Sequence, residues 1–111
     1  QGQFIFLGSE ASDESTQKSS LYSSAKHGLL GFSKALRAEC NKSDIRVTII
    51  NPGMVRTTFF KNLKFKPGKS KKNAINTNDI SDLILFLLKS SPYVNYSDIK
   101  LSPIKKVIDF N

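Results

Sequence analysis

Blocks of apolar residues, separated by polar stretches, predict three strands and two helices along this chain. Residues 3–8 contain four consecutive apolar side chains, which favours a buried strand in a parallel sheet. Residues 45–50 are rich in β-branched side chains and end at Asn51-Pro52-Gly53, so they predict a second strand that stops at a turn. Residues 98–102 predict a last, weaker strand, and we expect residues 103–111 to form a tail.

Two segments between these strands have helical character. A helix is predicted from about residue 21 to residue 41, because apolar residues recur there at steps of three and four: Ala25, Leu29, Phe32 and Leu36. We expect Thr77 or Asn78 to cap a second helix, which should be mostly buried because residues 80–88 are apolar almost all round. A short helix at residues 57–63 and a loop at 64–76 are expected between them. The alternation of strands and helices predicts an open α/β sheet, in which ligands bind at the carboxyl ends of the strands.

Composition and charge modify this picture in one place. The chain has 111 residues and a net charge of +8, and residues 56–72 hold seven basic side chains and no acidic one. Three interpretations of this segment stay open: a solvated mobile loop, a lid that favours an acidic substrate, and a nucleic-acid surface with phenylalanines for stacking. Because the excess is confined to one segment, nucleic-acid binding is the least favoured of the three.

Other compositional features narrow the class of protein. No run of 18 apolar residues is present, and we expect neither a membrane span nor a targeting leader. The single Cys40 excludes an internal disulfide and is expected to be a reduced, buried thiol. His27 has no partner at ligand spacing, which argues against a metal site. Together these features favour a cytoplasmic protein.

Candidate chemistry gathers at the predicted strand ends. Tyr22 and Lys26 are four residues apart, so they share one face of the first helix. An ammonium group near a phenol favours the phenolate, which suits the phenol to general acid/base catalysis. Ser9 directly follows the first strand, where its hydroxyl could hydrogen-bond a substrate carbonyl. Taken singly, each has a plainer interpretation: a half-buried Tyr with a solvated Lys, and one more Ser in a Ser-rich loop.

Three motifs occur together in order, and they resemble the short-chain dehydrogenase/reductase family. The chain has Ser9-Glu10-Ala11 after one strand, Tyr22-Ser23-Ser24-Ala25-Lys26 opening a helix, and Asn51-Pro52-Gly53-Met54-Val55-Arg56-Thr57 after the next strand. The family pattern is Ser-x-Ala, Tyr-x-x-(Ser/Ala)-Lys and Pro-Gly-x-(Val/Ile)-x-Thr in these contexts. The resemblance covers nearly the whole chain and implies the C-terminal part of a Rossmann-like doubly wound parallel sheet, in the order β-α-β-α-β.

The resemblance also implies roles for individual residues. Tyr22 would be the general acid/base, Lys26 would favour its phenolate and hold the nicotinamide ribose, and Ser9 would orient the substrate. The nicotinamide side would be lined by residues that follow the second strand: Pro52, Gly53, Val55 and Thr57. The activity implied is hydride transfer between NAD or NADP and an alcohol or carbonyl compound, with NADP slightly favoured. Arg56 could face a phosphate or simply lie on the surface.

The resemblance is incomplete, which sets further expectations. The family's Gly-rich turn and catalytic Asn are absent, so residues 1–111 are expected to be the C-terminal portion of a single domain that lacks its dinucleotide-binding half. The 56–76 segment would be its basic substrate lid. We expect the chain alone to be inactive. A truncated, non-catalytic relative that serves as a binding or assembly module is the alternative.

The expected partners follow from the same resemblance. We expect a small-molecule substrate, for which an acidic compound is one option, and a second copy of the chain. We do not expect a membrane as a partner. In the family, the helix with the Tyr-Lys pair often packs against its copy, and Gly28, Gly31 and Ala35 would permit close approach; packing within the chain is the alternative. Residues 97–103 weakly resemble the subgroup that oxidises 3-hydroxy acids such as serine.

Overall fold

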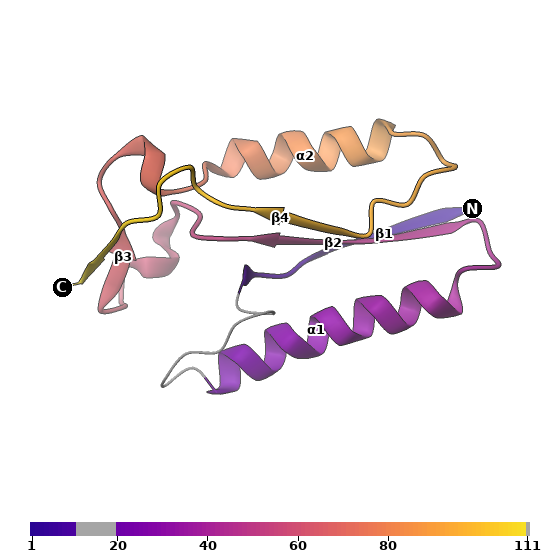
Figure 1. The fold of residues 1–111 in the computed structure, drawn as a ribbon, viewed down its shortest axis with the longest axis horizontal. Helices are drawn as coiled ribbons and strands as arrows, with labels where there is room; N and C mark the ends of the chain where they lie inside the picture. Colours follow the sequence, from indigo (N-terminus) through magenta and orange to yellow (C-terminus); the bar gives the residue numbers. More distant parts are fainter. Residues whose placement is uncertain (11–19, 111) are drawn as a thin grey trace.

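The fold is a three-layer α/β/α arrangement around a short parallel sheet. The structure is a computed structural model that describes residues 1–10 and 20–110. Strands β1 (Gly2–Leu7), β2 (Ile45–Pro52) and β4 (Asp98–Leu101) form a sheet in the order β1-β2-β4, with every pair parallel. Helices α1 (Ser20–Glu39) and α2 (Thr77–Lys89) lie on opposite faces of this sheet (Figure 1). The predicted α/β class, with a doubly wound parallel sheet, is confirmed.

The core is built on the central strand. Val47, Thr48, Ile49, Ile50 and Asn51 in β2 are each at most 2% exposed, because β2 has a strand on either side and a helix over each face. The β-branched sequence predicted this strand correctly, and its continuous burial is typical of parallel sheets.

Strand β1 is parallel as predicted, but the expectation that it is buried is wrong for the described residues. It lies at the edge of the sheet and pairs only with β2. Phe4 and Leu7 are therefore about half exposed, although Phe4 stacks on Phe6 with ring centroids 6.0 Å apart. A run of apolar residues indicates what a strand can bury, whereas the strand order decides what covers it.

Helix α1 is present where predicted, but its buried face is not the predicted one. Ser23 and Ser33 are its buried residues, whereas Ala25 and Phe32 are exposed. Small serine side chains face inward, and the Ser33 hydroxyl is satisfied by donating to the Leu30 carbonyl at 2.8 Å. Phe32 lies to the side and makes an edge contact with Phe6.

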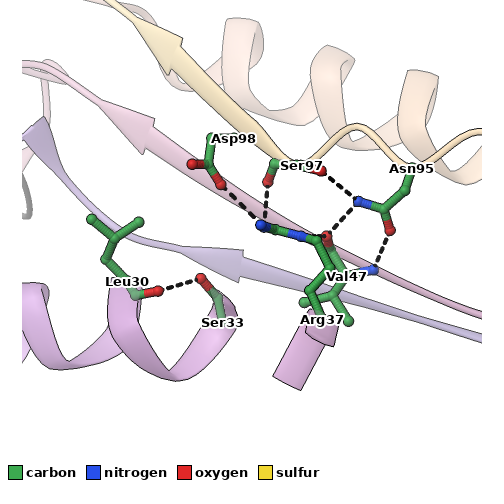
Figure 2. Close-up of polar contacts among 7 residues, drawn as sticks. All are labelled: Leu30, Ser33, Arg37, Val47, Asn95, Ser97 and Asp98. Carbon is green, nitrogen blue, oxygen red and sulfur yellow. Dashed lines mark hydrogen bonds and ion pairs between the residues drawn. The ribbon is translucent and has the colours of Figure 1, made fainter. Parts of the chain in front are cut away.

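The far end of α1 is held by a polar network at the start of β2 and β4 (Figure 2). Arg37 donates from Nε to the Val47 carbonyl at 3.1 Å and from Nη2 to the Ser97 carbonyl at 2.9 Å, and it pairs with Asp98 at 3.0 Å. Asn95 completes the network by accepting from the Val47 amide at 2.7 Å and donating to its carbonyl at 2.9 Å. One arginine thus joins the helix to two strands.

Helix α2 begins with a capping box that differs from the predicted cap. Asn76, rather than Thr77 or Asn78, is the cap: its side chain accepts from the Asn78 amide, and Asp79 accepts from the Asn76 amide. The expectation that α2 is mostly buried is wrong for the described residues, since only Leu87 is buried and Leu85, Phe86 and Leu88 are more than half exposed. A sheet covers only one face of a helix, so apolar side chains on the other faces of α2 are exposed among the described residues.

The last part of the chain is more regular than predicted. Strand β3 (Phe65–Pro67) pairs antiparallel with β5 (Ile108–Phe110), so the expected tail contains a strand that returns to the basic segment. Single 3₁₀ turns, η2 (Thr58–Phe60) and η3 (Lys71–Asn73), flank β3. None of the described helices is long and apolar enough to cross a membrane.

Candidate active site

The carboxyl ends of the three parallel strands meet at one edge of the sheet, as predicted. The amide of Gly8 donates to the Ile50 carbonyl at 2.7 Å, and the amide of Gly53 donates to the Leu101 carbonyl at 2.7 Å. Gly53 lies so close to its neighbours that a Cβ there would be 3.1 Å from a Glu10 carboxylate oxygen and 3.3 Å from Pro103. Glycine at position 53 thus lets the loops after β1, β2 and β4 pack together.

Ser9 is held at this edge by Asn51, a residue that the sequence reasoning did not assign to the site. The Asn51 side-chain oxygen accepts from the Ser9 amide at 3.1 Å, and Asn51 is 2% exposed. A Cβ on Gly8 would collide with that same oxygen, so Gly8 makes room for Asn51. The signal was present in the sequence, because a buried strand that ends in a polar Asn needs a hydrogen-bond partner for it. Ala11, the third residue of the serine motif, lies outside the described residues.

Tyr22 and Lys26 lie on one face of α1, as their spacing predicted. The first turns of α1 are at the same end of the sheet as the strand termini (Figure 1). The Lys26 ammonium nitrogen is 5.7 Å from the centroid of the Tyr22 ring, within reach of a cation–π contact. Tyr22 is 42% exposed, so its ring is partly covered while one side stays accessible.

The basic segment contacts Tyr22 through an aromatic ring. Phe59 in η2 lies with its centroid 6.2 Å from that of Tyr22, and it makes an edge contact with Phe60 at 5.1 Å. The turn is capped by Thr57, whose hydroxyl oxygen accepts from the Phe59 amide at 3.2 Å. The threonine of the Pro-Gly motif therefore also sets the position of the ring above Tyr22.

The basic segment is more than an irregular loop, and the C-terminal residues help to hold it. Arg56 donates from Nη2 to the carbonyls of Gly68 and Ser70, so it ties the start of the segment to its end. The Gly68 amide donates to the Val107 carbonyl at 2.8 Å, next to the β3–β5 pairing. The sequence reasoning missed β5 because three residues carry too little periodicity to be recognised as a strand.

The structure also shows the surroundings of His27, Cys40 and the two glycines of α1. The His27 ring nitrogen Nδ1 donates to the Ser23 carbonyl at 2.7 Å, one turn back along α1. Cys40 is free, as predicted, but half-buried rather than fully buried. Gly28 and Gly31 have nothing within 4 Å of where a Cβ would lie, so no described part of the chain packs closely against them.

Val55, one of the residues expected on the nicotinamide side, has a backbone amide and carbonyl that could meet a ligand. Val55 forms a parallel bridge with Ile75, in which the Ile75 amide donates to the Met54 carbonyl and the Arg56 amide donates to the Ile75 carbonyl. This pattern turns the amide and carbonyl of Val55 itself to the opposite side, where they have no hydrogen-bond partner among the described residues. A half-buried backbone donor and acceptor of this kind suit a carboxamide.

Comparison with known proteins identifies the family. Residues 1–67 match the sequence profile of the short chain dehydrogenases, and the chain belongs to this family of nicotinamide-dependent oxidoreductases. It is 36% identical over 98 residues to a human 3-oxoacyl-[acyl-carrier-protein] reductase, a match that covers 84% of this chain and 40% of that protein. The chain thus spans less than half the length of the curated relatives it matches.

Solved structures agree with the fold. The chain is 27% identical to the closed form of a serine dehydrogenase complexed with NADP⁺, with a TM-score of 0.73. The match covers 89% of this chain and 43% of the serine dehydrogenase chain. An alcohol dehydrogenase from the archaeon Thermococcus sibiricus, complexed with 5-hydroxy-NADP, has a TM-score of 0.77 at 22% identity, and covers 95% and 43% of the two chains. At that identity the second likeness shows the fold alone.

Proposed function

We propose that these residues form the catalytic half of an NAD(P)-dependent oxidoreductase that interconverts an alcohol and a carbonyl compound. The observation that carries the proposal is the Tyr22–Lys26 pair on α1, with the ammonium 5.7 Å from the Tyr22 ring centroid. Family membership supports the reaction class. A cytoplasmic location fits the single, free Cys40.

The proposed mechanism assigns one task to each residue. The Tyr22 hydroxyl donates a proton to the substrate oxygen during reduction and accepts it during oxidation, which is general acid/base catalysis. The Lys26 ammonium would bind the nicotinamide ribose and lie beside the Tyr22 ring. The Ser9 hydroxyl hydrogen-bonds the substrate oxygen, and Asn51 holds the Ser9 backbone in place.

The cofactor would be bound by residues after β2. Val55 would offer its amide and carbonyl to the carboxamide, Pro52 and Gly53 would line the ring, and Thr57 would approach the carboxamide or the diphosphate. A bound nicotinamide supplies or accepts the hydride. The choice between NAD and NADP is open, and the weak subgroup resemblance of residues 97–103 makes 3-hydroxy acids the first class of compounds to assay.

The lid has a proposed part in this reaction. Phe59 brings residues 56–76 into contact with Tyr22. This segment would therefore cover a bound substrate and exclude water. We also propose that the protein is a homo-oligomer in which the exposed face of α1 packs on its copy, since Gly28 and Gly31 open onto free space among the described residues.

A Tyr22→Phe substitution tests the assignment in the full-length protein that carries these residues. Removing one hydroxyl should lower kcat about 10²- to 10⁴-fold, the usual contribution of a positioned acid/base. The assay follows nicotinamide absorbance with a panel of alcohols. Lys26→Met should also be impaired, and Lys34→Met, an exposed lysine of the same helix, is the matched control. Activity of Tyr22→Phe within a few-fold of the unchanged protein would refute the assignment.

A further inference from the structure

A cavity of about 320 Å³ lies within the lid, between η2 and β3. Its lining contains three cationic side chains, Arg56, Lys61 and Lys66, and the hydroxyls of Thr57 and Thr58. None of the acidic side chains that the structure describes lines it. Cations combined with hydroxyl donors are the groups that bind carboxylate and phosphate oxygens.

Arg56 is pre-oriented at the cavity wall. Its Nη2 donates to the carbonyls of Gly68 at 2.6 Å and Ser70 at 3.1 Å, so the guanidinium is held in one orientation. Among the described residues, Nε and Nη1 have no hydrogen-bond partner. A guanidinium fixed through one nitrogen, with donors left over, loses little conformational freedom when it binds an oxyanion.

The described carboxylates form no ion pair with the arginine and lysines that line the cavity. Asp109 of β5 is opposite Lys66 of β3 in the strand register, yet no ion pair joins them among the described residues. Glu10 pairs with Lys106 at 3.5 Å, outside the cavity lining. The lysines of the 56–72 segment are exposed, so their combined field raises the local concentration of anions.

The cavity is connected to Tyr22 by aromatic rings. Tyr22 contacts Phe59, Phe59 contacts Phe60, and Phe60 lines the cavity. The centroid separations along this path are 6.2 and 5.1 Å. A substrate that reacts at Tyr22 and reaches the cavity therefore needs an apolar part that can lie against Phe59 and Phe60.

We propose that this cavity binds the anionic end group, a carboxylate or a phosphate ester, of a substrate whose alcohol or carbonyl end reacts at Tyr22. The proposal rests on the proposed function of Tyr22 and adds the class of substrate. Because two rings separate the reacting end from the cavity, this substrate is longer than a simple hydroxy acid such as serine. Phe59 and Phe60 contact its apolar middle.

Binding of small probes to the 111-residue chain tests the cavity without catalysis. Benzyl phosphate and 3-phenylpropanoate each carry an aromatic ring and an anion, and benzyl alcohol is the neutral counterpart. At low salt, NMR titration should show that both anions bind at least tenfold more tightly than benzyl alcohol. The two anions also reveal whether phosphate or carboxylate is preferred. Equal binding of the neutral probe would overturn the proposal.

A charge-matched pair of variants localises the effect. Lys61→Gln combined with Lys66→Gln should weaken benzyl phosphate binding about 10- to 100-fold, since each exposed charge-assisted contact contributes about 3- to 10-fold. Lys34→Gln combined with Lys89→Gln removes the same charge from α1 and α2, and should change binding less than about twofold beyond a small uniform effect of net charge. All four lysines are exposed, and circular dichroism checks the fold. Equal weakening by the two pairs would refute a cavity site.

Two further experiments distinguish this proposal from a cofactor site and from the proposed role of Tyr22. If NADP⁺ displaces benzyl phosphate, the anion site belongs to the cofactor diphosphate and the proposal is wrong. Tyr22→Phe should leave benzyl phosphate binding within about twofold, because the anion binds away from the hydroxyl. Loss of turnover in Tyr22→Phe with normal anion binding supports both proposals. If the unchanged protein turns over its substrate but binds neither anion, the cavity proposal is refuted and the assignment of Tyr22 stands.

Discussion

Replacing Arg37 by Met tests how the polar network of Figure 2 holds α1, the helix that carries Tyr22. Methionine retains the length and much of the apolar stem but removes the guanidinium. The lost interactions are hydrogen bonds to the carbonyls of Val47 and Ser97 and an ion pair with Asp98. The network joins α1 to β2 and β4, so its loss should reduce the stability of the whole sheet–helix unit.

The size of the loss in unfolding free energy depends on which hydrogen bonds the two carbonyls keep after the substitution. The Val47 carbonyl still accepts from Asn95 at 2.9 Å, and the Ser97 carbonyl still accepts from the Ile49 amide at 2.9 Å. Because neither acceptor is orphaned, the cost is that of two net hydrogen bonds, about 0.5–1.5 kcal/mol each, rather than a larger desolvation penalty. The ion pair adds less than about 1 kcal/mol, because the side chains of Arg37 and Asp98 are 24% and 40% exposed. We expect a total loss of about 1–4 kcal/mol.

Urea unfolding followed by circular dichroism measures this loss. Asp98→Asn is the matched partner: it removes only the charge and should cost less than about 1 kcal/mol, and its effect should shrink in high salt. Arg37→Met should be affected little by salt because carbonyl bonds make up most of its effect. A loss below about 0.5 kcal/mol for Arg37→Met, or one no larger than that of Asp98→Asn, would refute this account.

Two further predictions concern glycines. Gly8→Ala should destabilise the chain by about 1–3 kcal/mol in urea unfolding, because its Cβ would collide with the buried Asn51 side chain. Gly2→Ala, where the nearest atom is 4.0 Å away, is the control, and equal stability of the two variants would contradict the packing argument. Gly31→Leu should shift the protein toward the monomer in sedimentation experiments, because a bulky side chain would keep two α1 helices apart. Ser24→Leu, also exposed on α1, serves for comparison, and an unchanged oligomer in Gly31→Leu would place the interface elsewhere.

Local pattern was sufficient for much of this protein. β-Branched residues specified β2, the steps of three and four specified the extent of α1, and the Tyr22–Lys26 spacing specified one shared helix face. These features depend on neighbours within a few residues, so the sequence alone determines them. The order of the three motifs likewise indicated the family before any contact was known.

Features that depend on distant partners were decided by the tertiary structure. Whether Phe4 is covered depends on the strand order, and whether Leu85 or Phe86 is covered depends on which face of α2 lies against the sheet. The buried face of α1 carries Ser23 and Ser33 rather than Ala25 and Phe32, and the rotation of the helix over the sheet decides which residues are covered.

The basic segment shows the same division most clearly. Its charge was evident from residues 56–72, but its shape depends on β5, which lies about 40 residues further along the chain and pairs with β3. Pairing between strands so far apart leaves no periodic signal in either, because each holds only three residues. The sequence alone therefore determined that a cationic segment follows the Pro-Gly motif. Only the folded chain places that segment beside Tyr22, where its Phe59 contacts the Tyr22 ring and its other residues line a cavity.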